Sequence, residues 1–404
     1  MESKEKEKNL AYAHMLSHEE INAMPGREMK EKRTRNGKLY DLGDGHYQAV
    51  LCPQPVHAKN DQGEWEEIDH TLVQKGNEYE NTSPDLSVRF SPGGVVTLNQ
   101  GKYTLSWSLP GAVPAVPKEI KPEKKSVIPR QDEKINLESA VEYHELLPGV
   151  DMIARIQPNR FKDVLVFKNQ QSLRPVEFHL HAPGMQLVQK EDGDVLALDG
   201  DDMIFRLPAP FAVDEQDNPV SGSAHAALKE LDREYWAWIV EVDKEFAAGV
   251  ALPIRLDPVV ETGQASDNAS MAYVTSEEES ISHPVNTQEI TKIAHNYPGE
   301  GECFTFLRYD TLPEIDSSYY VTAATLTMRS RSNNGGKNVY LREVRDDWDP
   351  TTITYIMATN GTVTVGDKYL EYANVGGTGT VVNFNIANQV RQWYTGTNHG
   401  LRLK

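Results

Sequence analysis

The sequence has only two cysteines in 404 residues, Cys52 and Cys303, and they do not form a CxxC pair. This scarcity excludes a disulfide framework and a zinc site built from cysteines, and it leaves the redox state of both thiols open. Long apolar runs are also absent, and stretches such as Phe246 to Leu252 are too short to span a bilayer, so we expect no membrane insertion. The first residues, MESKEKEKNLAYAHML, lack the apolar core of a secretory signal. Either the chain is intracellular, or its export signal lies outside this sequence.

Positive charge is in short supply. Lys and Arg total 41 against 60 for Asp and Glu, which gives a formal net charge of −19 and a pI near 5.1. A surface this acidic repels phosphate backbones, so we expect neither nucleic acid nor an anionic membrane as a partner. The 28 Gly and 23 Pro are near average, which excludes a collagen-like repeat and wholesale disorder. The length is sufficient for two or three packed cores.

Short alternating runs separated by Gly-rich turns make up most of the chain. Two Asp-Gly pairs, Asp192-Gly193 and Asp199-Gly200, are hairpin signals because such a turn needs positive φ at its central residues. This pattern of short strands and turns predicts an all-β fold. We expect two or more antiparallel β lobes followed by a jelly-roll-like β-sandwich, with a short N-terminal helical arm.

Composition divides the chain into five expected parts. They are a charged, partly helical arm (1–36), an N-terminal β lobe (37–113), a Pro- and Lys-rich linker or loop (114–135), a second β lobe (136–260) and the β-sandwich (265–404). The arm predicts a helix from Asn9 to Met24, or a shorter one capped by Ser17. The small polar residues 261–268 mark the boundary before the sandwich.

No catalytic constellation can be picked out of the sequence. G-x-S-x-G is absent, and carboxylates are too abundant for one glycosidase pair to be identified. His14 with His18, and His179 with His181, have spacings that could place two imidazoles on one metal, but a charged arm and an ordinary strand explain them better. The acidic stretch 191–202 is explained by two hairpin turns without an ion. We expect no enzyme and no cofactor, with a structural calcium left open.

Aromatic residues of the last part are the candidates for ligand binding, since sugar rings stack on exposed Trp and Tyr faces. The set comprises Tyr340, Trp348, Tyr355, Trp393 and Tyr394. Core packing is the competing interpretation, and it is favoured for Trp348 and Trp393. The expected carbohydrate-binding residues are Tyr340, Trp348 and Tyr394, of which Tyr394 lies beside a polar turn.

Several ordered blocks in the last part carry a family resemblance. They are Phe306–Asp310 leading to Leu312-Pro313, Val339–Val344, Trp348 followed by Thr352–Tyr355, and Val390–Trp393 before Gly396. Their order and spacing resemble the DNRLRE domain, a family grouped with carbohydrate-binding modules. Tyr355 stands where that family usually has Trp. The chain also stops about where the sandwich would need its last strand, so an unpaired edge strand is expected there.

The region from Asn36 to Val260 resembles the part that precedes this domain in large secreted, cell-wall-associated RHS/YD-repeat proteins of Gram-positive bacteria. The blocks are Gly63–Asp69, Val141–Asp151, Leu207–Phe211 and Pro253–Pro258. No YD repeats and no toxin-like domain follow, so toxin activity does not carry over. The resemblance implies secretion or a place at the cell surface. It also implies polysaccharide or cell-wall glycan, and other domains of a longer RHS-type chain, as partners.

The favoured interpretation is a non-catalytic extracellular or cell-surface module that binds carbohydrate. The alternative is a structural or assembly segment of a larger RHS-type secreted protein. A carboxylate-based polysaccharide-degrading enzyme is a third, less favoured interpretation.

Overall fold

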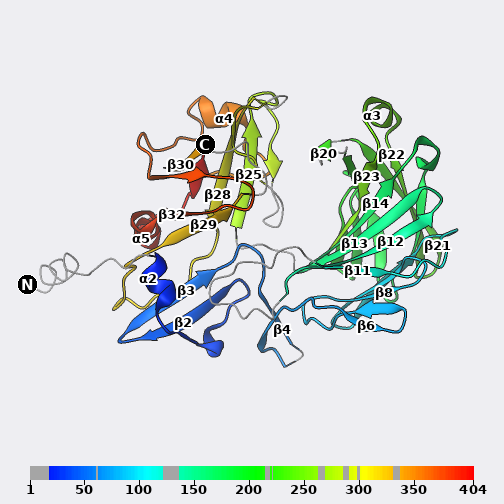
Figure 1. Ribbon diagram of the computed structural model, residues 1–404, viewed down its shortest axis with the longest axis horizontal. Helices are drawn as coiled ribbons and strands as arrows, with labels where there is room; N and C mark the ends of the chain where they lie inside the picture. The colour runs from blue at the N-terminus through cyan, green and yellow to red at the C-terminus, as the bar shows by residue number, and fades with distance from the viewer. Residues whose placement is uncertain are drawn as a thin grey trace, which may run out of the picture. The chain divides into compact units, whose positions relative to one another are not determined.

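The computed structural model describes residues 18–60, 62–121, 136–213, 219–220, 222–262, 269–284, 291–297, 301–330 and 337–404. Antiparallel strands dominate these ranges and helices are few (Figure 1), so the expected all-β fold is confirmed. The strands fall into two compact units: residues 1–54 together with 267–404, and residues 55–266. No helix within the described ranges is long and apolar enough to cross a membrane.

The unit of residues 55–266 is a sandwich of two large antiparallel sheets. One has the order β21-β22-β15-β10-β9-β8-β7-β6, and the other follows the path β11-β12-β13-β14-β24-β18-β17-β16. The strands of the first sheet are Val73–Lys75 (β6), Glu78–Glu80 (β7), Ser87–Ser91 (β8), Val95–Gln100 (β9), Tyr103–Ser108 (β10), Val176–His181 (β15), Ala224–Asp232 (β21) and Tyr235–Val242 (β22).

The second sheet of this unit has eleven strands, because three short strands pair beside its main path. Its strands are Lys118–Ile120 (β11), Ser139–Leu147 (β12), Val150–Gln157 (β13), Arg160–Phe167 (β14), Gln186–Gln189 (β16), Val195–Asp199 (β17), Asp202–Leu207 (β18), Phe211–Val213 (β19), Pro219–Val220 (β20), Ile254–Asp257 (β23) and Val259–Thr262 (β24). Smaller elements of the unit are the hairpin His57–Lys59 (β4) with Trp65–Glu67 (β5), the turn Gln170–Ser172 (η2) and the helix Lys244–Gly249 (α3). The expected Asp-Gly hairpins join β16, β17 and β18, with φ of 94° at Gly193 and 62° at Gly200.

Both sheets contribute alternate residues to one shared core. Phe161 of β14 meets Phe90 of β8 and Trp107 of β10, with ring centroids 6.0 and 5.2 Å apart. The strands on either side of residues 114–135 also share a sheet, since β10 pairs with β15. The lobes expected from composition, residues 37–113 and 136–260, are therefore not separate, because strands of both belong to one sheet. Alternation marks which residues face a core but does not say which strands pair.

The other unit is built on a seven-stranded sheet with the path β26-β25-β28-β33-β30-β31, and β27 pairs beside β28. Its strands are Ala269–Thr275 (β25), His283–Pro284 (β26), Ala294–Tyr297 (β27), Gly301–Tyr309 (β28), Lys337–Glu343 (β30), Glu371–Val375 (β31) and Leu401–Leu403 (β33). One face packs on the two-stranded sheet of Thr325–Arg329 (β29) and Val381–Asn385 (β32) and on the helix Ala387–Thr395 (α5). The opposite face packs on the segment that contains the helix Tyr355–Thr359 (α4).

The last strand of this sheet lies in its interior. β33 pairs with β28 on one side and with β30 on the other (Figure 1). The unpaired edge expected at the end of the chain is therefore absent from this sheet. The chain returns between two existing strands, which a local sequence pattern does not reveal.

The N-terminal part of this unit is a small three-stranded sheet. Its elements are the helix His18–Ala23 (α2), Arg27–Glu28 (β1), the turn Lys30–Lys32 (η1), Gly37–Gly43 (β2) and His46–Leu51 (β3). The described part of the expected arm helix is α2. The remainder of that prediction, including His14 and Ser17, lies outside the described residues.

Candidate binding surface

Trp348 is a core residue. It is 5% exposed, its Nε1 donates a hydrogen bond to the carbonyl of His399 at 2.8 Å, and its ring lies 5.5 Å from that of Phe306. The Arg308 guanidinium covers the ring at 5.3 Å. Because the ring is enclosed, this candidate does not offer a face to a sugar.

Tyr394 lies on α5 at the side of an open groove. The groove is lined by Asp310, Leu312, Trp393 and Asn398 among others. Tyr394 is half-buried, and its hydroxyl donates to the carbonyl of Pro313 at 2.8 Å. Polar groups of the groove are also engaged, since Asp310 accepts hydrogen bonds from Ser270 and Arg308. The Tyr394 hydroxyl and the Asp310 carboxylate are therefore already used within the protein.

Tyr340 belongs to a cluster of three tyrosines on the sheet. Its ring lies 4.5 Å from that of Tyr369 and 5.9 Å from that of Tyr372, with interplanar angles of 35° and 32°. Tyr340 on β30 stands directly opposite Tyr372 on β31. Tyr369 is 48% exposed and Tyr372 is 60% exposed, so the tyrosine cluster presents aromatic surface to solvent. Sequence reasoning found Tyr340 but missed its two partners, which only the strand pairing brings together.

Two arginines adjoin the tyrosine cluster. The guanidinium of Arg342, two residues after Tyr340 on the same strand face, lies 4.4 Å from the centre of the Tyr369 ring. Arg402 on β33 is the direct cross-strand neighbour of Arg342. The combination of tyrosine rings with guanidinium groups suits a ligand that has both a ring and a negative charge.

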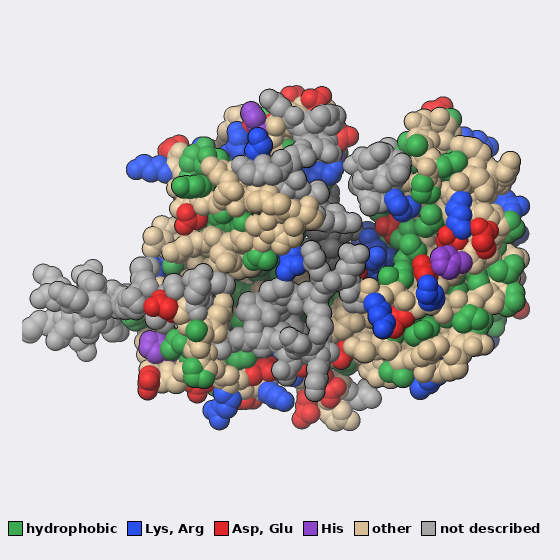
Figure 2. Space-filling view, in the orientation of Figure 1, with side chains coloured by type: hydrophobic (Ala, Val, Ile, Leu, Met, Phe, Trp, Pro, Cys, Tyr) green, Lys and Arg blue, Asp and Glu red, His purple; other side chains and the backbone are tan. Residues whose placement is uncertain are grey.

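Charges elsewhere are mixed rather than gathered by sign. Figure 2 shows acidic and basic side chains interspersed over the coloured surface of this view. In the acidic stretch 191–202, Asp194 accepts from Arg206 at 2.6 Å and Asp199 accepts from Tyr103 at 2.7 Å. These two carboxylates are thus committed to protein partners in the hairpins.

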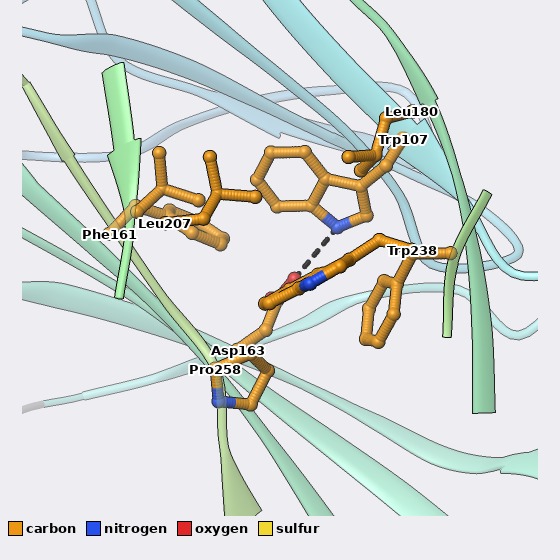
Figure 3. A pocket seen from close by; sticks show the side chains of 9 residues that line it. Trp107, Phe161, Asp163, Leu180, Leu207, Trp238 and Pro258 are labelled. Atoms are coloured by element: carbon orange, nitrogen blue, oxygen red, sulfur yellow. Dashed lines mark hydrogen bonds between the residues drawn. The ribbon is translucent and has the colours of Figure 1, made fainter. Parts of the chain in front are cut away.

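The 55–266 unit encloses a buried carboxylate beside two tryptophans (Figure 3). Trp107 Nε1 donates to Asp163 Oδ2 at 2.7 Å across a cavity of about 10 Å³ that Trp238 also lines. Burial raises the pKa of Asp163 to about 8, and the nearby Asp257 adds to the rise. Among the described residues, Asp163 Oδ1 and Trp238 Nε1 have no hydrogen-bond partner. The cavity is of the size of one water molecule, so it is too small to admit a substrate.

A buried Ser–Asp–His grouping in the same unit is not arranged for nucleophilic catalysis. Ser83 Oγ donates to Asp85 Oδ1 at 2.6 Å, while His70 approaches the other oxygen of Asp85 at 3.3 Å. His70 is therefore not positioned to take a proton from Ser83. The grouping anchors a loop, since Asp85 also accepts from the backbone N–H of Asn159 at 2.8 Å.

Comparisons with known proteins point to wall-associated proteins. Over 400 residues the chain is 23% identical to "tRNA nuclease WapA" of Bacillus subtilis (strain 168), an alignment that covers 93% of this chain and 16% of that protein. The "tRNA3(Ser)-specific nuclease WapA" of Bacillus spizizenii is 23% identical over 404 residues, with the same coverage of 93% and 16%. The "Wall-associated protein" of Geobacillus stearothermophilus is 26% identical over 212 residues, covering 49% of this chain and 78% of that protein. The chain thus spans about 16% of the length of the nucleases.

These similarities indicate that the chain is related to a wall-associated protein and to one part of the WapA nucleases. They also correct one expectation. We expected no enzyme, but curated relatives are named tRNA nucleases, so the non-enzymatic interpretation does not stand. No protein-family model matches the chain, and the DNRLRE resemblance remains a prediction.

Proposed function

We propose that this chain is a structural segment that holds a longer RHS-type protein at the cell wall, and that the longer protein is a nuclease of the kind its relatives are named for. The observation that carries the proposal is the alignment, which runs through 93% of this chain but through only 16% of each nuclease. A segment repeated in this way across wall-associated proteins fits a shared supporting part.

The construction of the two units supports a structural role. Each unit has its own core of buried strand residues. Such units can present other domains of a long protein at a surface.

The tyrosine cluster supports direct contact with wall glycan. Its rings come from β30, from β31 and from the segment just before β31, and Tyr369 and Tyr372 are exposed, so they can accept the C–H face of a sugar. Tyr340, from the expected site, lies in this cluster. Tyr394 remains a candidate at the groove, and the enclosed ring of Trp348 gives it no part in the proposal.

Sedimentation with purified cell walls tests the proposed wall contact. We expect the full chain to pellet with Bacillus subtilis walls and the Tyr369→Ala/Tyr372→Ala double variant to be retained several-fold less. Loss of one stacked ring costs about 1–3 kcal/mol on the nearest available scale, that of base stacking. Tyr320→Ala is the matched control, since Tyr320 is 48% exposed and lies outside the cluster. A folded chain that stays in the supernatant contradicts the proposal.

Incubation with total tRNA tests where the nuclease activity lies. If the full chain cleaves tRNA, catalysis resides in these residues and the supporting role is overturned. Intact tRNA, under conditions in which a longer relative cleaves it, would place catalysis in another part of the longer protein.

A further inference from the structure

Two arginines face each other across neighbouring strands of the seven-stranded sheet. Arg342 of β30 and Arg402 of β33 are direct antiparallel partners, so their side chains project from the same face. Lys404, two residues beyond Arg402, lies on that face as well. Like charges placed directly opposite each other destabilise a sheet unless something between them carries the opposite charge.

Arg402 is a buried cation. The residue is 6% exposed, and its buried Nε has no hydrogen-bond partner among the residues that the structure describes. Its guanidinium lies over the Phe304 ring at 4.6 Å. Burial lowers the pKa of Arg402, and the positive charge of Arg342 lowers it further. An isolated buried cation is costly, and arginine cannot escape the cost by losing its proton near neutral pH.

Arg342 is only slightly better satisfied. Its Nη1 donates one long bond of 3.4 Å to the carbonyl of Gly366, and its buried Nε has no partner among the described residues. Its side chain is half-buried, so it provides the solvent-facing side of the arginine pair.

The carboxylate that acts on Arg402, that of Glu302, is already engaged. Glu302 accepts from Lys404 Nζ at 2.7 Å and from the Tyr355 hydroxyl at 2.9 Å. His295 Nδ1 lies 3.3 Å from the same carboxylate. The arginine pair therefore keeps a surplus of positive charge within a chain whose net charge is −19.

We propose that Arg342 and Arg402 form a binding site for one anionic group, a carboxylate or a phosphate, carried by a wall polymer whose adjacent ring or chain packs on the tyrosine cluster. The forked donors of a guanidinium match the oxygens of both groups. Tyr340 lies one side-chain repeat from Arg342 along β30, so an anion at the pair places the rest of the unit over Tyr340 and Tyr369.

A single anionic unit fits this surface better than a nucleic acid does. One arginine pair provides two cations at one point, whereas a nucleic-acid backbone is held by basic side chains repeated along its length. The site deepens the proposed wall contact and rests on it for the identity of the polymer.

Calorimetric titration of the full chain tests the site. The probes are sodium glucuronate for the carboxylate and sodium phosphate for the phosphate, with glucose as the neutral control. We expect saturable binding of at least one anion, weakening as NaCl rises, and none of glucose. The anion that binds more tightly identifies the source as an acidic sugar or a phosphate-linked polymer.

Matched variants separate the site from general charge. Arg342→Gln should lose at least about tenfold in affinity, as expected for a charge-assisted pair, and Arg402→Met should do the same. Arg345→Gln removes the same charge from a side chain that is 51% exposed and lies 3.7 Å from Glu343, so it should leave the affinity unchanged. In parallel, the bound anion should raise the melting temperature of the native chain but not that of Arg342→Gln.

Three results overturn the site: no saturable binding of either anion by the folded chain, an equal loss in Arg345→Gln, or tighter binding of tRNA that Arg342→Gln abolishes. The last result would make a nucleic acid the occupant. The proposed function fails separately. If walls do not retain the chain while the anion still binds, the site stands and wall attachment does not.

Discussion

Each of the two units buries an ionisable group that its own residues leave incompletely paired, and the two groups resolve the cost differently. In the 55–266 unit, Asp163 receives one hydrogen bond from Trp107, and burial raises its pKa to about 8, so the carboxyl holds its proton at neutral pH. In the other unit, Arg402 cannot become neutral in this way. A buried carboxyl can lower its cost by taking up a proton. A buried arginine stays charged, and the proposed bound anion would neutralise it.

The largest expected difference between the two groups is that Asp163 makes the free energy of unfolding depend on pH. The unfolded chain ionises this carboxyl near pH 4, whereas the folded chain holds the proton to about pH 8. Stability from this group is therefore complete below about pH 4 and is lost as the pH rises to about 8, by at most about 6 kcal/mol. Asp163→Asn should flatten this part of the curve. The check is the free energy of unfolding in denaturant at several pH values. An unchanged slope in the variant would mean that Asp163 is ionised in the fold.

Arg402→Met should have the next largest effect and the opposite character. Replacing an unpaired buried charge with an apolar side chain of similar length should leave the protein as stable, or more stable by about 1–4 kcal/mol. The change should not depend on pH between 4 and 8, because arginine stays charged throughout. Chemical denaturation without added anions measures it. A loss of more than about 2 kcal/mol would show that Arg402 stabilises the sheet by itself.

Trp107→Phe should have a smaller effect on the Asp163 side. The substitution removes the hydrogen bond to Asp163 and should cost about 1–3 kcal/mol. Because that bond lowers the pKa of Asp163, its loss should extend the pH-dependent region to higher pH. Unfolding curves at pH 7 and pH 9 measure both changes. Trp236→Phe is the control, since Trp236 is buried in the same core but does not line the cavity.

The difference between the units also marks how far the sequence can be interpreted alone. Alternating runs and Asp-Gly turns predicted the all-β class and the β16–β17–β18 hairpins, because both signals are local. Strand partners are not local. The pairing of β10 with β15 joins two expected lobes into one sandwich, and β33 enters the middle of a sheet rather than its edge. Nothing in the period of a strand determines these choices.

The candidate surface was predictable only in part for the same reason. Tyr340 was expected as a binding residue, but pairing between distant segments places Tyr372 opposite it and Arg402 opposite Arg342. Trp348 is a residue type that binds sugars, yet it is 5% exposed, and its Nε1 and ring contact other residues of the core. Residue type shows what a side chain can bind, while burial decides whether it is free to do so.

Arg345→Gln should have the smallest effect on stability. It is the reference for the loss of one exposed positive charge, against which the Arg402 substitution is compared. Arg345 is 51% exposed, and its contacts with Glu343 and Asp367 are 3.7 and 4.0 Å long, so water already screens them. Its removal should change the free energy of unfolding by no more than about 0.5 kcal/mol. The same loss of one positive charge at Arg402 should leave stability equal or higher and remove anion binding. If the two substitutions have the same effect in denaturation and in anion titration, then position in the sheet does not distinguish these arginines. The contrast between Asp163, which is neutralised by its own proton, and Arg402, which is neutralised by a bound anion, would then fail.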